Sequence, residues 1–258
     1  MNKIYNNQTF VDVILPNYNK EQFVEEAIGS VVEQTYKNYH LYIIDDNSTD
    51  NSKKIINKFS HLKNVTIIEL KKNKGPSFCR NLGMRISSSK YISFIDSDDS
   101  WVLDKLEKQI LYMEKNNLTF TYTDYTPFFQ NNGVKNIKKK TSLVEHFNYK
   151  TFIKNSSINT TTMIISRSIL GNHRFMKVKL LEDYLFKCKL LKDNNTAKKL
   201  NEDLAFYRIL NISRSSQRLK NIYWLWNINK NYNKLNFFQN IISVLNISIN
   251  SIKKYGIK

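Results

Sequence analysis

The sequence has little cysteine and histidine and no long apolar run, and each shortage narrows the classes of protein to which it can belong. Its two cysteines, Cys79 and Cys188, lie far apart, so they predict neither a disulfide framework nor a zinc site, and a reducing compartment is expected. The four histidines are scattered without metal-ligand spacing. No apolar run approaches the roughly 18–20 residues of a membrane span, and residues 1–10 lack the apolar stretch of a signal peptide. A cytoplasmic protein without membrane spans is therefore expected.

Acidic residues are also few: 22 Asp and Glu stand against 40 Lys and Arg, and the formal charge is +18. Such a charge favours an anionic partner, which could be nucleic acid, a phosphate-bearing substrate or a membrane surface. Compositional drift explains it equally well, because Lys, Asn and Ile are abundant throughout. The 41% of hydrophobic and 13% of aromatic residues indicate a folded chain, and 258 residues allow one large α/β domain with or without an appendage.

The first half of the chain alternates between two hydrophobic periods. Short apolar runs predict strands at 10–18, 39–46, 64–70 and 90–96, the first of them buried. Apolar residues at helical spacing predict helices at 21–35, 48–59, 75–87 and 103–116, the third with Pro76 in its first turn. Alternation of this kind with short links implies a mostly parallel sheet.

The alternation of strand and helix patterns ends after a strand-like segment at 119–126. Residues 128–142 are polar and basic, which predicts a mobile loop. The patterns further on predict a strand followed by a helix at 159–170, a helix at 180–191, a strand at 196–209, and two amphipathic helices over 216–232 and 236–254.

Polar residues follow three of the first four predicted strands, in the segments PNYN (16–19), IDDNSTD (44–50) and IDSDD (95–99). In an open parallel sheet, ligands bind beyond the carboxyl ends of the strands, so these segments should share one rim. For DDNSTD, helix capping and turn formation are an alternative to ligand binding. For DSDD, three neighbouring acids repel one another unless a cation compensates. A divalent cation held by carboxylate and phosphate oxygens would do so, which suggests a metal–diphosphate site.

Five segments of the chain are informative together: VDVILPNYN (11–19), YIIDDNSTD (42–50), NKGPSFCRNLG (73–83), YISFIDSDDSW (91–101) and LLED (180–183). In their order and spacing, these segments resemble the family 2 inverting glycosyltransferases with a GT-A fold. The resemblance covers roughly residues 10–210. It implies an α/β catalytic domain over 1–215, with a nucleotide-binding half at 10–120 and an acceptor half at 120–215, followed by a helical tail at 216–258.

The resemblance assigns five residues to the nucleotide, of which Asp96 lies in the DSDD segment. Pro16 and Tyr18 should line the base pocket, and Asp46 should accept a hydrogen bond from the uracil imide or an equivalent base edge. Arg80 should lie by the nucleotide, in a segment that matches the family's GxxxARN with Cys79 in place of the usual alanine.

The resemblance assigns the metal to the DSDD segment. Asp96 should face the ribose and sugar, and Asp98 should ligate Mn²⁺ or Mg²⁺ bridging the diphosphate. Asp99 is one acid more than the motif needs, and we expect it to be solvent-exposed or to cap a helix.

The acceptor side should carry a general base, because an inverting transfer removes a proton from the attacking hydroxyl. LLED resembles the family's ED motif, which makes Asp183 that base, with Glu182 orienting the site; an acidic first turn of a helix is the alternative reading. For Arg208, in a segment resembling YRxxxxSxS, a place near the diphosphate and a structural ion pair are left open. The QxxRW motif of processive relatives is absent, so transfer of a single sugar is expected.

The resemblance thus implies an enzyme that uses a nucleotide-sugar donor, expected to be a UDP-sugar, and a glycan or polyprenyl-diphosphate-linked acceptor. Two other readings are an inactive scaffold of the same fold and a basic nucleic-acid-binding protein. Acidic residues at the strand ends argue against a nucleic-acid partner, because a face that binds nucleic acid should be basic.

The tail at 216–258 mixes aromatic residues and lysines, which suits peripheral binding to an anionic membrane surface at the inner face of the cell membrane. Packing of the tail on the catalytic domain is the alternative.

Overall fold

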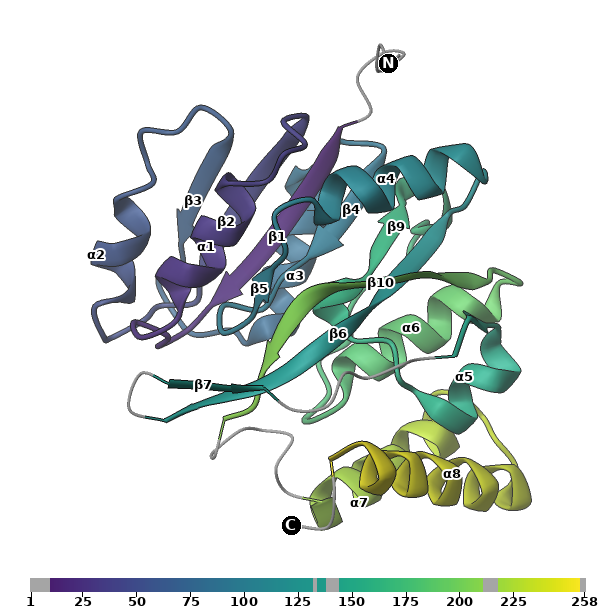
Figure 1. Cartoon of the computed structure of the whole chain (residues 1–258). Coiled ribbons are helices and arrows are strands. Elements are labelled where there is room, and N and C mark those ends of the chain that lie inside the picture. The colour runs from purple at the N-terminus through teal and green to yellow at the C-terminus, as the bar shows by residue number, and fades with distance from the viewer. Residues whose placement is uncertain (1–9, 132–133, 138–143, 211–217, 256–258) are drawn as a thin grey trace.

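A computed structural model of the chain describes residues 10–131, 134–137, 144–210 and 218–255 (Figure 1). These residues form one mixed sheet with the strand order β3-β2-β1-β4-β9-β6-β10-β5, to whose members β7 and β8 also pair. The strands are β1 (Val11–Asn17), β2 (Tyr39–Asp45), β3 (Val65–Glu69), β4 (Tyr91–Phe94), β5 (Ser100–Trp101), β6 (Phe120–Asn131), β7 (Val134–Ile137), β8 (His146–Phe147), β9 (Ile164–Ser166) and β10 (Ala197–Arg208).

The first four strands are parallel, as their apolar runs predict. β1 lies between β2 and β4 in parallel register, and β3 pairs with the other side of β2. Every residue of β1 is buried, which is typical of a parallel strand that helices cover on both faces. The antiparallel β9 then joins β4 to β6, with which β10 runs parallel.

Helices cover both faces of the sheet (Figure 1). They are α1 (Val24–Val32), α2 (Ser52–Asn57), α3 (Pro76–Ile86), α4 (Lys105–Lys115), α5 (Tyr149–Asn155), α6 (Glu182–Lys192), α7 (Arg218–Asn231) and α8 (Phe237–Tyr255), with 3₁₀ turns η1 (Thr160–Thr162) and η2 (Arg167–Ile169). On one face, Gln34 after α1 donates to the carbonyl of Val102 at 2.7 Å and accepts from the backbone N–H of Leu106 in α4 at 2.9 Å. On the other face, Phe175 stacks on Phe186 of α6 at 4.0 Å between ring centroids.

The predicted loop at 128–142 is wrong where the structure describes it. β6 continues to Asn131, and β7 pairs with it in antiparallel register from Val134 to Ile137. The segment is polar because the ladder of β6 and β7 is held by backbone hydrogen bonds, which leave no apolar period in the sequence. Residues 132–133 and 138–143 lie outside the described residues.

Two other sequence expectations need correction. The helix expected near the end of 159–170 is only the 3₁₀ turn η2 after β9. The short α5 was not expected, although Asn148 and Thr151 form a capping box at its start, a signal that the sequence carries.

The C-terminal helices dock on the domain through buried polar side chains. Tyr184 of α6 donates to Asn229 Oδ1 of α7 at 2.8 Å, and Asn229 Nδ2 donates to Ser243 Oγ of α8 at the same distance. Asn229 and Ser243 are both fully buried. A satisfied buried network of this kind fixes how the two helices lie against α6. No helix in the described ranges is long and apolar enough to cross a membrane.

The contact of α3 with β1 yields a stability prediction. An added Cβ at Gly83 would stand 2.6 Å from Cγ2 of the buried Ile14. Overpacking should cost about 1–3 kcal/mol and the gain in helix propensity should return about 1 kcal/mol, so we expect Gly83→Ala to lower the free energy of unfolding by up to about 2 kcal/mol. Urea unfolding measures the change. Gly29→Ala in α1 is the matched control, because nothing lies within 4 Å of its added Cβ; equal effects of the two changes would contradict the prediction.

Candidate functional site

The parallel strands β1, β2 and β4 end at one rim of the sheet, and the segments that follow them form the candidate site. The first acid of the DD pair holds a turn at this rim. Asp45 Oδ1 accepts from Asn17 Nδ2 at 2.8 Å and from Ser48 Oγ at 2.6 Å, and Asp45 Oδ2 accepts from the Ser48 N–H at 2.9 Å. For Asp45 and Ser48, turn formation therefore explains the sequence, as the alternative reading proposed.

The second acid, Asp46, holds the loop that leads into α3. Its two carboxylate oxygens accept the backbone N–H groups of Lys74 and Gly75, each at 2.7 Å, and the residue is 3% exposed. Gly75 has a φ of 85°, which glycine adopts without steric cost. A carboxylate has about four lone-pair sites, so Asp46 keeps acceptor capacity for a further donor. Its contact with a nucleotide base stays a prediction.

Pro16 and Tyr18 lie on either side of the last residue of β1. Pro16 is buried and registers with Ile44 of β2, whereas the side chain of Tyr18 is 45% exposed beyond the strand end. An exposed aromatic ring above the rim is available for stacking. The proposed base pocket around these two residues stays a prediction.

Arg80 of α3 links the two halves of the site. Its Nη2 donates to Asp96 Oδ1 at 2.6 Å, its Nη1 lies 3.7 Å from Glu182 Oε1, and its guanidinium lies 5.3 Å from the ring centroid of Phe175. Burial alone would lower the pKa of Arg80, but the charges of Asp96 and Glu182 outweigh it and raise the pKa above its ordinary value.

Two nitrogens of this guanidinium, Nε and Nη1, are buried and have no hydrogen-bond partner within the described part of the chain. Buried donors without acceptors are costly, which makes the group ready to receive an additional anionic acceptor.

Asp98 faces a cation supplied by the chain itself. Lys20 Nζ lies 2.7 Å from Asp98 Oδ2, and the two side chains are 27% and 21% exposed. Among the described residues, no group of three or more His, Cys, Asp or Glu side chains could hold a metal by itself. A partly exposed carboxylate next to a diphosphate still fits Mn²⁺ or Mg²⁺, because Mg²⁺ in particular is bound by one or two carboxylates plus substrate phosphates.

The expectation for Asp99 is wrong, because this residue is neither exposed nor a helix cap. It is 2% exposed, its Oδ2 accepts from Thr161 Oγ1 at 2.5 Å, and its Oδ1 accepts from the Arg208 N–H at 3.0 Å. Burial, with the neighbouring charges of Asp98 and Asp96, raises the pKa of Asp99 well above its usual range. Asp99 thus ties the acidic segment to η1 and to β10.

Arg208 forms a structural ion pair, one of the two alternatives that the sequence left open. Its Nη2 donates to Glu26 Oε2 at 2.6 Å, its Nε donates to the Asp98 carbonyl at 2.9 Å, and its guanidinium lies 4.5 Å from the ring centroids of both Phe23 and Phe128. Arg208 therefore supports the backbone of Asp98 from behind.

Asp183 lies in the first turn of α6, directly after Glu182, whose carboxylate faces Arg80. The preceding Leu181 has φ 63° and ψ 31°, a left-handed conformation that is costly for leucine and that residues at functional sites often adopt. Asp183 Oδ2 accepts from Lys187 Nζ at 2.8 Å and from Thr160 Oγ1 at 3.4 Å.

The side chain of Asp183 is 39% exposed, so it can meet a substrate, whereas that of Lys187 is 2% exposed. Burial would raise the pKa of Asp183, but the charge and hydrogen bond of Lys187, together with Arg80, lower the pKa to about 2. The carboxyl group is therefore ionised throughout the neutral range.

Sequence reasoning missed Lys20, Thr161 and Lys187. The pairing of Asp183 with Lys187 could have been found, because positions four apart meet on one side of a helix. Lys20 and Thr161 meet the acidic segment across 78 and 62 positions of sequence, and no local pattern reports such contacts.

The structure resembles solved glycosyltransferases. TarS of S. aureus (residues 1–349, in complex with UDP-GlcNAc) matches with a TM-score of 0.71 and 18% identity over 95% of this chain and 73% of that one. A mannosyltransferase from Pyrobaculum calidifontis, in complex with GDP-Man and Mn²⁺, matches with a TM-score of 0.66 and 13% identity over 96% of this chain and 76% of that one. The sheet with its flanking helices is a GT-A fold.

The sequence comparisons identify the family. The model of glycosyl transferase family 2 matches residues 12–185. The Escherichia coli protein WfgD, a UDP-Glc:alpha-D-GlcNAc-diphosphoundecaprenol beta-1,3-glucosyltransferase, is 32% identical over 247 residues, which cover 95% of each chain. The chain belongs to glycosyl transferase family 2.

Proposed function

We propose that this glycosyltransferase transfers a single sugar from a nucleotide-diphosphate sugar to an acceptor hydroxyl, with inversion at the anomeric carbon. The observation that carries the proposal is the position of Arg80. It contacts Asp96 after β4 and Glu182 at the start of α6, so residues assigned to the donor and acceptor sides meet at one buried guanidinium with two unfilled donors.

The reaction is one displacement. The acceptor oxygen bonds to the anomeric carbon while the bond from that carbon to the diphosphate oxygen breaks, and the nucleoside diphosphate leaves with the electron pair. The acceptor proton passes to a carboxylate oxygen of Asp183. A low pKa makes Asp183 a weak base, but the attacking hydroxyl becomes strongly acidic as its oxygen bonds to carbon, so a weak base suffices late in the step.

The donor is proposed to be a UDP-sugar. TarS has been crystallised with UDP-GlcNAc, and WfgD uses UDP-Glc, which supports a uridine nucleotide here. Pro16 and Tyr18 would line the base pocket, Asp46 would accept from the base, and Asp96 would face the ribose and sugar. Mn²⁺ or Mg²⁺, held by Asp98, would offset the charge of the diphosphate; the mannosyltransferase with Mn²⁺ supports a divalent cation.

The acceptor is proposed to be a glycan on a polyprenyl diphosphate, in the assembly of a cell-surface polysaccharide. This rests on WfgD, whose name gives a GlcNAc-diphosphoundecaprenol acceptor. A lipid-linked acceptor lies in the headgroup layer, so the reaction would take place at the cytoplasmic face of the cell membrane. We propose no nucleic-acid partner, because the rim presents carboxylates to the ligand.

A panel of nucleotide sugars tests the proposal. In the presence of Mn²⁺ or Mg²⁺, a UDP-sugar is expected to raise the melting temperature and to be transferred to GlcNAc on a polyprenyl diphosphate, and NMR of the product should show the inverted anomer. A retained anomer, or transfer that is equally fast with a chelator present, would contradict the mechanism. Transfer of the sugar would also exclude an inactive scaffold of the same fold, whereas salt-dependent retention on DNA without nucleotide binding would favour the nucleic-acid reading.

A further inference from the structure

The helix α8 turns an apolar stripe toward the surface. Five residues at alternating spacings of four and three positions are exposed along it, and we call them the outer stripe: Phe238, Ile242, Leu245, Ile249 and Ile252, exposed by 75%, 46%, 56%, 47% and 41%. The opposite side of α8 faces the domain: Asn240 and Ser243 are buried there, and the partly buried Val244 and Ile247 pack against the core. A contiguous exposed apolar surface of this kind marks an interaction site.

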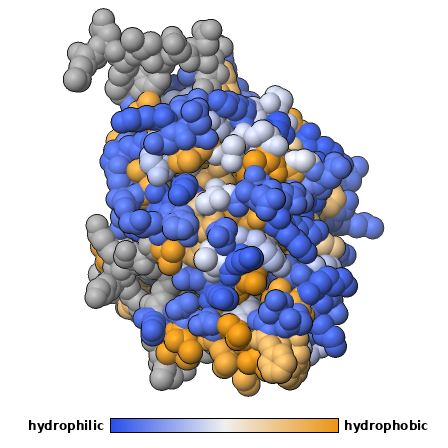
Figure 2. Space-filling model, turned by 90° about the vertical axis from the view of Figure 1, so that its right-hand side faces the viewer, coloured by the Kyte–Doolittle hydropathy of each residue, from blue (hydrophilic) through white to orange (hydrophobic). Residues whose placement is uncertain are grey.

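The apolar surface continues onto α7. Leu219, Ile222 and Tyr223 are exposed there, and Trp226 follows them on the same side of the helix. The Trp226 ring contacts that of Phe237, with 5.8 Å between centroids, so the two helices share one apolar face. Figure 2 shows apolar side chains gathered along the lower edge of the molecule, where Figure 1 places α7 and α8.

The charges around this face have one sign. No Asp or Glu follows Asp203 in the sequence. Residues 237–252 of α8 carry no charge at all, and exposed lysines lie near the ends of the two helices: Lys220, Lys230, Lys234 and Lys253. An apolar helix face with cations at its ends is the arrangement of a helix that lies in a lipid headgroup layer, where lysines extend their charge to the phosphates.

The face also lies on the side of the molecule where the site opens. β1 runs downward in Figure 1 toward its carboxyl end, and α7 and α8 lie at the bottom of the same view. The hydrogen bonds from Tyr184 through Asn229 to Ser243 hold both helices against α6, which carries Asp183.

We propose that the joined apolar face of α7 and α8 docks on an anionic lipid leaflet, with both helices lying in the headgroup layer. This adds a partner to the proposed function, but its test needs no sugar, so its failure would leave the proposed transfer untouched. Charge favours lipid over a second copy of the chain. Stripes at this spacing also pair as coiled coils, but two copies of a surface that has only positive charges would repel each other.

The test is co-sedimentation of the full chain with vesicles of phosphatidylcholine and phosphatidylglycerol, at low and high salt. We expect binding at low salt and much weaker binding at high salt or to phosphatidylcholine alone. Replacing three members of the outer stripe by serine should weaken binding at least about ten-fold. The variant is Ile242→Ser, Leu245→Ser and Ile249→Ser. These positions are exposed, so the fold should persist, and circular dichroism checks this.

The matched control removes the same residue types from other exposed positions. It carries Leu103→Ser, Leu111→Ser and Ile137→Ser, whose side chains are 53%, 49% and 67% exposed, and it should bind like the parent chain.

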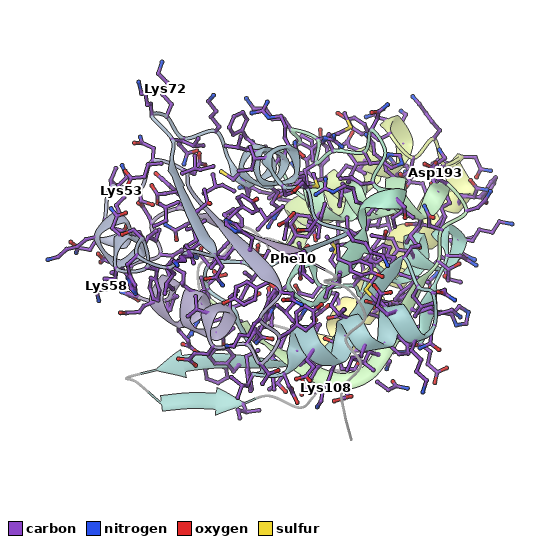
Figure 3. The ribbon with its side chains drawn as sticks, turned by 90° about the horizontal axis from the view of Figure 1, so that it is seen from above. Phe10, Lys53, Lys58, Lys72, Lys108 and Asp193 are labelled. Atoms are coloured by element: carbon purple, nitrogen blue, oxygen red, sulfur yellow. The ribbon has the colours of Figure 1, made fainter. Side chains whose placement is uncertain are left out.

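A second pair of variants tests the charge. Lys230→Gln, Lys234→Gln and Lys253→Gln should weaken binding to anionic vesicles on the order of 100-fold, about five-fold for each lysine. The control removes as much charge from the far edge of the sheet, where Figure 3 shows Lys53, Lys58 and Lys72 pointing outward.

Three outcomes would overturn the proposal. In the first, the parent chain does not bind anionic vesicles at low salt. In the second, a variant and its control lose equal amounts of vesicle binding. In the third, the outer-stripe variant binds vesicles like the parent chain, and only the lipid-free protein changes, from dimer to monomer in sedimentation. The last would identify a second copy as the occupant.

Discussion

Asp183→Asn is expected to lower the turnover of sugar transfer by roughly 10²–10⁴-fold, the usual contribution of a general base. Asparagine has the same shape and its Oδ1 can still accept from Lys187 Nζ, which also donates to the Ile158 carbonyl at 2.7 Å, so the fold should be unchanged. Donor affinity should also be nearly preserved, because the base acts on the acceptor. Single-turnover kinetics with calorimetry of UDP binding separates the two effects.

Asp193→Asn is the control for this change. Asp193 follows the other end of α6, and its side chain is 61% exposed and paired with His173. Its substitution should leave turnover unchanged. If Asp183→Asn retained near-normal transfer, Asp183 would lose the role of base.

The same assignment fixes the pH dependence of the reaction. Because the pKa of Asp183 is about 2, this carboxylate should cause no loss of rate between about pH 5 and pH 8. The pKa of Asp183 is lower than in the unfolded chain, so the stability from the ion pair with Lys187 is fully present above about pH 4 and is lost only as the pH falls toward about 2.

The variant Lys187→Met tests the cause of the low pKa. It removes the main positive charge that opposes the effect of burial on Asp183, so the pKa of Asp183 should rise and the acidic limb of kcat/KM should move to higher pH. Lys192→Met, at the exposed end of α6, should leave the profile in place.

The parallel half of the fold could be predicted from the sequence because each element there carries its own period. β1, β2 and β4 are largely buried apolar runs followed by polar residues, β3 is a half-buried apolar run, and α3 begins at Pro76 as expected. The 128–142 segment could not be read in this way, because β7 is held by backbone pairing to β6 and leaves no apolar pattern. The predicted tail helices exist as α7 and α8, but only the structure shows that α7 buries Leu225 and Ile228 while α8 leaves an apolar stripe exposed.

The sequence indicates which acidic residues lie at the candidate site, but it does not indicate which residues contact them. Asp46, Asp96, Asp98 and Asp183 stand out in the sequence because they follow strands or begin a helix. Asp99 looks like one more surface acid, yet Thr161 and Arg208 bury it, since contacts across such sequence distances follow from the fold and not from local spacing. Asp45 and Asp46 are adjacent, but one holds a turn and the other the α3 loop.

Asp98→Asn is expected to abolish metal-dependent binding of UDP while leaving the fold intact. An amide oxygen carries no net charge, so it binds Mn²⁺ or Mg²⁺ much more weakly than a carboxylate does. The variant loses the ion pair with Lys20, which at this partly exposed position is worth about 0.2–1 kcal/mol. It also removes a charge that raises the pKa of the buried Asp99, so relief of repulsion offsets part of that loss. Calorimetry of UDP with and without Mn²⁺ measures the first effect, and urea unfolding the second.

The variant Lys20→Met tests the same assignment by removing the cation that is paired with Asp98. In the free protein the Lys20 ammonium neutralises Asp98, so a metal ion has to displace it from the carboxylate. Without that competitor, Mn²⁺ should bind more tightly with UDP, by up to about five-fold if the ion pair is worth up to about 1 kcal/mol. Metal affinity that falls in Asp98→Asn and rises in Lys20→Met would identify Asp98 as the ligand. An Asp98→Asn protein with unchanged metal-dependent UDP affinity would remove it from that role, because no other described carboxylate at the rim faces an exchangeable cation in this way: Asp96 is held by Arg80, and Asp99 is buried against Thr161.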